Sequence, residues 1–204
     1  MTKVKICGLT EEVHVKAAVE AGADAIGFVF APSSRRISIE EAKRLSAMIP
    51  ENILKIGVFV NASKAELHDI YETVGLDYIQ LHGEESPDFI QTVGLPTIKA
   101  FSVKEEADVQ KALNYQVDYY LFDAPGLDFK GGSGIPFDWT LLQNSGIQKE
   151  KIILAGGLHT DNVREAIDQV QPYMVDVSSG VERNKRKDER LIRAFIEAVR
   201  DEER

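Results

Sequence analysis

Short runs rich in β-branched and aromatic residues recur along this chain at a spacing of roughly 25 residues. Each run is almost continuously hydrophobic, which is typical of strands buried on both faces of a parallel sheet. Amphipathic stretches with helical spacing separate the runs. They span residues 4–7, 25–30, 56–60, 78–82, 97–101, 119–123, 152–155 and 174–177. Eight strand–helix units predict an α/β fold, a single-domain (β/α)8 TIM barrel over residues 1–204. An open doubly wound sheet is the alternative, although it more often has about five or six strands.

Serine residues mark where several of the expected helices begin. Ser38, Ser63 and Ser102 are each followed three residues later by glutamate, the pattern of a capping box. Ser86 precedes Pro87, which suits an N-cap followed by proline at the first helical position. The final helix carries one apolar stripe, formed by Leu191, Ile192, Phe195, Ile196 and Val199.

The composition and net charge indicate which kinds of binding partner the protein can have. The chain has 44% hydrophobic and 28% charged residues, as a soluble globular protein does. Its net charge of −9 argues against nucleic-acid or membrane partners, although a locally positive pocket could still bind a small anion. A single cysteine permits no internal disulfide, and no signal peptide or membrane-spanning run is visible. We therefore expect a cytoplasmic protein.

Two reactive side chains end strand-like runs. In a (β/α)8 barrel the active site lies at the carboxyl ends of the strands, which makes Cys7 and Asp123 candidates. A lone cysteine is most often a small buried hydrophobe, yet nearby cations or a helix N-terminus can turn it into a thiolate. Asp123 could cap the following turn or act as a catalytic carboxyl group. Local sequence leaves both alternatives open.

Three glycine- and serine-rich turns follow later strands, at residues 131–134, 156–157 and 178–180. They could be plain tight turns. Glycine also lets backbone N–H groups approach a phosphate closely, and barrels often bind phosphate after strands seven and eight. The position of the last two turns favours a phosphate site.

Other polar residues carry weaker signals. The histidines, at positions 14, 68, 82 and 159, show no metal-ligand spacing, so no metal is expected. His82 alone is more often structural. Arg35 and Arg36 could be surface charges, or one could pair with a carboxylate. Residues 182–187 are expected to form a charged, mobile loop.

Taken in order, the motifs of this chain resemble those of the phosphoribosylanthranilate isomerase family of tryptophan biosynthesis. The start Lys5-Ile6-Cys7-Gly8 combined with residues 176–182 (Asp-Val-Ser-Ser-Gly-Val-Glu) is the most specific part. The other matching pieces are residues 27–30 (Gly-Phe-Val-Phe), 33–38 (Ser-Ser-Arg-Arg-Ile-Ser), 57–60 (Gly-Val-Phe-Val), 80–83 (Gln-Leu-His-Gly), 131–134 with 137–139, and 155–158 (Ala-Gly-Gly-Leu).

The resemblance implies an Amadori rearrangement of N-(5-phosphoribosyl)anthranilate without cofactor or metal. Cys7 would be the general base and Asp123 the general acid, with Arg35 binding the anthranilate carboxylate and Arg36 as second choice. The partner would be this small-molecule substrate, with no nucleic acid and no membrane, and the enzyme a monomer or homodimer. Further substrate contacts are expected at His82, Gly132, Ser133, Gly134, Gly156, Gly157, Asp176, Ser178, Ser179 and Gly180.

The sequence departs from the family's motif at one place. The family usually has a glycine shortly before its Lys-Asp pair, here Lys187 and Asp188, whereas this chain has Asn184-Lys185-Arg186. That leaves the conformation of the last loop open.

Two other functions are possible for such a barrel. One is another phosphosugar isomerase of the histidine-pathway type, which would want aspartate at position 7, and the other is a non-catalytic phosphometabolite-binding barrel. A thiol redox sensor would need a resolving cysteine, which the chain lacks.

Overall fold

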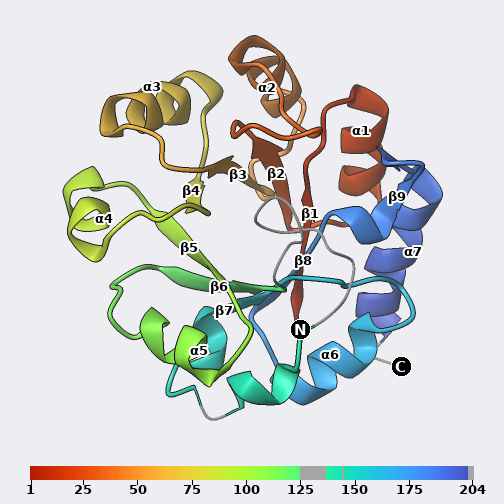
Figure 1. Cartoon of the computed structure of the whole chain (residues 1–204). Helices are drawn as coiled ribbons and strands as arrows, with labels where there is room; N and C mark the ends of the chain where they lie inside the picture. Colours follow the sequence, from red (N-terminus) through yellow and green to blue (C-terminus); the bar gives the residue numbers. More distant parts are fainter. Residues whose placement is uncertain (125–136, 144, 202–204) are drawn as a thin grey trace.

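The computed structural model describes residues 1–124, 137–143 and 145–201, and in it eight parallel strands close into a barrel in sequence order (Figure 1). The expected (β/α)8 barrel is confirmed. Strand boundaries differ from the expected runs by no more than two residues. The strands are β1 (Lys3–Cys7), β2 (Ala25–Val29), β3 (Leu54–Phe59), β4 (Tyr78–Leu81), β5 (Thr97–Ser102), β6 (Tyr119–Asp123), β7 (Ile152–Leu154) and β8 (Met174–Val177).

Helices surround the barrel on its outside (Figure 1). They are α1 (Glu12–Glu20), α2 (Ile39–Ser46), α3 (Lys64–Val74), α4 (Pro87–Val93), α5 (Glu106–Ala112), α6 (Val163–Val170) and α7 (Glu189–Arg200). Between β6 and β7 the described residues form only two 3₁₀ turns, η1 (Trp139–Leu142) and η2 (Lys149–Lys151). The sixth of the eight expected strand–helix units therefore has no α-helix among its described residues.

The serine caps are confirmed at three of the four expected positions. Ser38, Ser63 and Ser86 each accept the N–H of the residue three positions on. The expected cap at Ser102 is wrong, because that residue pairs with Asp123 at the end of the β5–β6 ladder. Helix α5 instead begins after Glu105. Sheet pairing therefore outweighs a local capping signal here.

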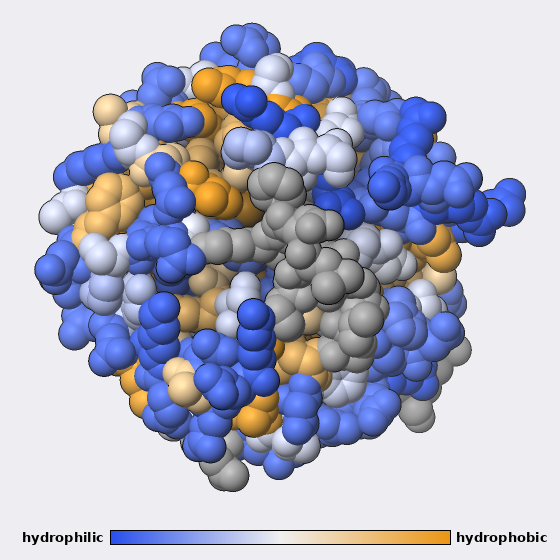
Figure 2. Space-filling view, in the orientation of Figure 1, coloured by the Kyte–Doolittle hydropathy of each residue, from blue (hydrophilic) through white to orange (hydrophobic). Residues whose placement is uncertain are grey.

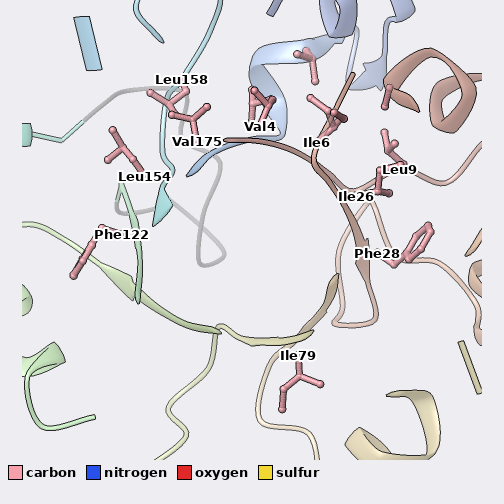
Figure 3. Close-up of a cluster of buried hydrophobic side chains, with 14 of the residues drawn as sticks. Val4, Ile6, Leu9, Ile26, Phe28, Ile79, Phe122, Leu154, Leu158 and Val175 are labelled. Atoms are coloured by element: carbon pink, nitrogen blue, oxygen red, sulfur yellow. The ribbon is translucent and has the colours of Figure 1, made fainter. Parts of the chain in front are cut away.

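Side chains alternate between the two sides of the barrel wall. Those pointing outward, which include Ile26, Phe28 and Phe122, pack beneath the helices (Figure 3). The buried apolar residues inside the barrel are fewer: Ala25, Ile56, Ile98, Ala100, Leu121, Ile153, Ala155 and Met174. The helical stripe on α7 is buried as expected, apart from half-buried Leu191. This close packing gives the strand ends a rigid base.

Residues 182–187 form a β-hairpin, where the sequence suggested a loop. Strands β9 (Glu182–Arg183) and β10 (Arg186–Lys187) pair antiparallel. Asn184 and Lys185 join them with φ values of 53° and 62°, the left-handed backbone that a two-residue type I′ hairpin requires. The hairpin is held from within by an ion pair of 2.9 Å between Lys187 Nζ and Glu182 Oε1.

On the face shown in Figure 2, the surface is mainly hydrophilic, and apolar side chains form small patches separated by polar groups. Within the described ranges, no helix is long and apolar enough to cross a membrane.

Candidate active site

Cys7 and Asp123 end strands β1 and β6 and are almost fully buried, with 8% and 7% of their surface exposed. His82, just after β4, has Nε2 at 3.8 Å from Asp123 Oδ2. Gly156, just after β7, lies so close that a Cβ there would be 2.7 Å from Asp123 Oδ1. The barrel thus brings residues from distant parts of the chain to one mouth.

The surroundings of Asp123 favour the protonated form of its carboxyl group. Burial and the negative charge of Asp176 raise the pKa of its carboxyl group to about 7, while the Ala124 N–H and Lys5 act in the opposite direction. This is the direction that a general acid requires. After burial, the largest contribution that raises this pKa is the like charge of Asp176.

Cys7 has a pKa above its ordinary value, because burial outweighs the cations around it. Lys5 and Lys187 favour the thiolate, and Asp176 disfavours it. The sequence suggested that a helix N-terminus could help. Helix α1 begins only at Glu12, so the local help comes from the two lysines instead. In the unliganded protein the thiol is therefore mainly protonated near neutral pH.

Arg35 lies against Gly8, the residue that follows Cys7 in the chain, and its charge interacts with that of Cys7. The Arg35 side chain crosses Gly8, where an added Cβ would lie 2.8 Å from Arg35 Cδ. Its Nε and Nη2 donate to the two carboxylate oxygens of Glu182 at 2.6 and 2.9 Å. Arg36 is exposed to solvent. Of the two arginines, only Arg35 is held where a ligand in the barrel mouth could reach it.

The turns after β7 and β8 contact each other, since a Cβ on Gly180 would clash with the carbonyl of Leu158. Backbone N–H groups with no acceptor among the described residues occur at Gly156, Gly157, Ser179 and Gly180. Clustered unpaired N–H groups suit an anion such as phosphate. The expected contacts at Gly132, Ser133 and Gly134 lie outside the described residues.

Ser178 links the turn after β8 to strand β1, which carries Cys7. Its Oγ donates to the carbonyl of Cys7 at 3.2 Å, and Lys187 Nζ donates to its carbonyl at 2.8 Å. Sequence reasoning missed Lys187 because it lies in the supposed mobile loop.

Sequence reasoning also missed Lys5 and Gln80. Lys5 Nζ donates to Asp176 Oδ2 at 2.7 Å and to Gln80 Oε1 at 2.9 Å inside the barrel. A lysine in an otherwise apolar strand was the available signal, because a fully buried cation needs partners. The other oxygen of Asp176, Oδ1, is buried and accepts no hydrogen bond from any described residue.

The described side chains include no group of three or more His, Cys, Asp and Glu able to hold a metal ion. A metal-free site stays a prediction.

Known proteins resemble this chain over nearly its whole length. The family model for N-(5'phosphoribosyl)anthranilate (PRA) isomerase matches residues 4–198. An N-(5'-phosphoribosyl)anthranilate isomerase of Listeria innocua is 48% identical over 197 residues, covering 97% of each chain. One from Bacillus cereus is 50% identical over 195 residues, covering 95% of this chain and 96% of its relative.

Solved structures agree with the sequence comparisons. Phosphoribosyl anthranilate isomerase from Thermotoga maritima superposes with a TM-score of 0.89 at 40% identity, covering 98% of this chain and all (100%) of that one. Another solved isomerase is in complex with reduced 1-(o-carboxyphenylamino)-1-deoxyribulose 5-phosphate. It is 39% identical, has a TM-score of 0.87, and the match covers 98% of this chain and 100% of that one.

Proposed function

The chain belongs to the N-(5'-phosphoribosyl)anthranilate isomerase family, and we propose that Cys7 and Asp123 carry out the family's reaction as general base and general acid. The enzyme catalyses the Amadori rearrangement of N-(5-phosphoribosyl)anthranilate to 1-(o-carboxyphenylamino)-1-deoxyribulose 5-phosphate in tryptophan biosynthesis. The observation that supports the assignment is a buried carboxyl group with a pKa near 7 at the same barrel mouth as the only thiol.

The reaction needs one proton donor and one proton acceptor. Asp123 gives its proton to the furanose ring oxygen, the C1′–O bond breaks, and the nitrogen lone pair forms an iminium ion. The Cys7 thiolate then removes the proton from C2′, leaving an enolamine that tautomerises to the ketone. Positioned acid and base groups contribute on the order of 10²–10⁴ each to the rate.

Three anchors would hold the substrate between these groups. The remaining guanidinium N–H donors of Arg35 suit the anthranilate carboxylate, since Glu182 engages only Nε and Nη2. The unpaired N–H groups of the turns after β7 and β8 suit the phosphate. Asp176 Oδ1 has unused acceptor capacity for a ribose hydroxyl. Fixing the pose supplies much of the effective molarity.

His82 would contact the substrate beside Asp123. Its Nε2 lies 3.8 Å from Asp123 Oδ2, close enough for both side chains to contact the same sugar. We assign it a substrate contact and no proton transfer of its own.

The decisive experiment is turnover of N-(5-phosphoribosyl)anthranilate, made in situ from anthranilate and phosphoribosyl pyrophosphate and followed by loss of its fluorescence. We expect Cys7→Ser and Asp123→Asn each to lower kcat by at least about 10² with little change in KM. Near-normal kcat in either variant would remove that residue from its role.

We also propose that the enzyme works in the cytoplasm as a monomer or homodimer. The family's biosynthetic role and the single cysteine support the location, and one related Thermotoga maritima isomerase is described as dimeric. Light scattering across a concentration series measures the oligomeric state. Fractionation of cells tests the location.

A further inference from the structure

A buried ion pair lies inside the barrel, with its lysine on the same strand as Cys7. Lys5 has none of its surface exposed and Asp176 has 8%. They occupy paired positions on the neighbouring strands β1 and β8, and Lys5 Nζ donates to Asp176 Oδ2 at 2.7 Å. Gln80 on β4 holds the same ammonium group at 2.9 Å. Nothing in the acid–base assignment above requires this pair.

The cation end of the pair lies against the thiol. Lys5 and Cys7 are two residues apart on β1, so both side chains point into the barrel. Gly27 on β2 pairs with Cys7 and leaves room for both. A Cβ on Gly27 would lie 2.7 Å from Cys7 Sγ and 3.1 Å from Lys5 Cε. The sulfur atom and the lysine stem therefore lie side by side over one glycine.

The two charges act unequally on the acid and the base. After burial, the largest influence on the pKa of Cys7 is Lys5, which lowers it, ahead of Asp176, which raises it. For Asp123 the order is reversed: Asp176 raises its pKa more than Lys5 lowers it. Burial lowers the pKa of Lys5, but the charges of Asp176 and Cys7 more than offset this and hold it above its ordinary value, so the ammonium group stays charged.

We propose that the Lys5–Asp176 ion pair is a fixed dipole that prepares both reactive groups, its cation stabilising the Cys7 thiolate and its anion keeping Asp123 protonated. The catalytic use of this ion pair rests on the acid–base assignment of Cys7 and Asp123. Its effect on the ionisation of the two groups is a property of the protein without substrate. Lys5 is thus a positioning residue that acts through Cys7, not a catalytic residue.

Other charges also face the two groups and stay in place when the pair is changed. Lys187 and Arg35 influence Cys7, and both are bonded to Glu182, which offsets part of their charge. His82 faces Asp123 from β4 at 3.8 Å. Since these groups are common to all variants of the pair, differences between the variants report on Lys5 and Asp176.

The test measures ionisation in the absence of substrate. Thiolate formation is followed by ultraviolet absorbance against a Cys7→Ser blank, which is unambiguous because the chain has one cysteine. Ionisation of Asp123 is followed by carboxyl ¹³C NMR, assigned with Asp123→Asn. Lys5→Met should raise the pH at which half of Cys7 is ionised, the thiol midpoint, by about 1–3 pH units. Asp176→Asn should lower the same midpoint.

The decisive variant is Lys5→Met/Asp176→Asn, which leaves no unpaired buried charge and so should fold even if the single variants do not. We expect its thiol midpoint to rise and its Asp123 midpoint to fall relative to wild type. Midpoints that move in the same direction, or do not move, would overturn the proposal.

A matched control comes from Lys99, a second buried lysine, whose Nζ lies 3.1 Å from Glu85 Oε2 on the outer side of β5. Lys99→Met should destabilise the protein and leave both midpoints unchanged.

Turnover provides an independent readout. Lys5→Met should lower kcat about tenfold or more near neutral pH, with KM little changed and partial recovery at higher pH. If Cys7→Ser turned over normally, the acid–base assignment would fail while the midpoints still tested the dipole. If the midpoints moved as expected but kcat did not, the dipole would be real and without catalytic use, which would also overturn the proposal.

Discussion

Glu182 Oε1 and Oε2 accept hydrogen bonds from Arg35 Nε and Nη2 at 2.6 and 2.9 Å, so the arginine of the barrel mouth is held in one orientation before any substrate arrives. Holding a guanidinium group in advance reduces the side-chain entropy lost when a ligand carboxylate binds. Glu182 belongs to the hairpin after β8, whereas Arg35 follows β2. Barrel closure is what brings them together.

Arg35→Ala should raise KM by about 10- to 100-fold with kcat nearly unchanged, because a charge-assisted contact to the anthranilate carboxylate contributes about 1.5–3 kcal/mol. Arg36→Ala is the matched control, since that side chain is exposed. Steady-state kinetics of both variants decide the assignment. If only Arg36→Ala raised KM, the carboxylate site would be one residue further on.

The contribution of Asp123 to the free energy of unfolding should fall as the pH rises from about 4 to about 7. The pKa of Asp123 is raised in the folded state, to about 7 from an ordinary value of 3.8, so its contribution is complete below the lower value and is lost as the pH passes the upper one. The loss is on the order of 4 kcal/mol. Urea denaturation at about pH 5 and about pH 8 should show a smaller pH dependence in Asp123→Asn. Identical pH dependence in the two proteins would contradict the raised pKa.

The pH profile of kcat/KM should be a bell whose acidic limb has a midpoint near 7. The pKa of Asp123 is about 7 and that of Cys7 lies above its ordinary value of 9.0, so the reactive form, a thiolate with a protonated carboxyl group, is a minority at every pH. Its population is greatest between the two values. A maximum on the acidic side of pH 7 would contradict this order of the pKa values.

Lys185→Gly should stabilise the protein by about 0.5–1 kcal/mol without changing kcat or KM. Lys185 is exposed and has a φ of 62°, where a residue with a Cβ is strained. Asn184→Gly should gain less, because asparagine tolerates this backbone. Thermal denaturation of both variants compares them. A loss of stability in Lys185→Gly would show that the hairpin is not strained there.

Lys99→Met should cost roughly 3–5 kcal/mol, because it leaves the Glu85 carboxylate buried without its cation. Glu85 also accepts the N–H groups of Asn61 and Gly83, so it joins the loops after β3 and β4. Glu85→Gln combined with Lys99→Met should recover part of the loss. Denaturant titration of the single and double variants gives the coupling. Additive losses would mean that the two side chains act independently.

Much of this architecture is visible in the sequence because it depends on local pattern. Near-continuous apolar runs predicted all eight barrel strands, and serine at three of four positions marked the start of a helix. Ser102 was the exception, because it is part of strand β5 and pairs with Asp123 of β6. Strand order in turn places Cys7 and Asp123 at one end of the barrel, which makes them candidates from the sequence alone.

The sequence by itself determined the barrel and the strand ends to which we assign the chemistry, because hydrophobic periodicity and turn residues act over short separations along the chain. Only the tertiary structure decided the electrostatics. Lys5 and Asp176 are 171 positions apart, and their ion pair exists because β8 closes against β1. Burial inside that closed barrel raises the pKa of both Asp123 and Cys7. Such shifts depend on distance and solvent exclusion in three dimensions, which no local pattern encodes.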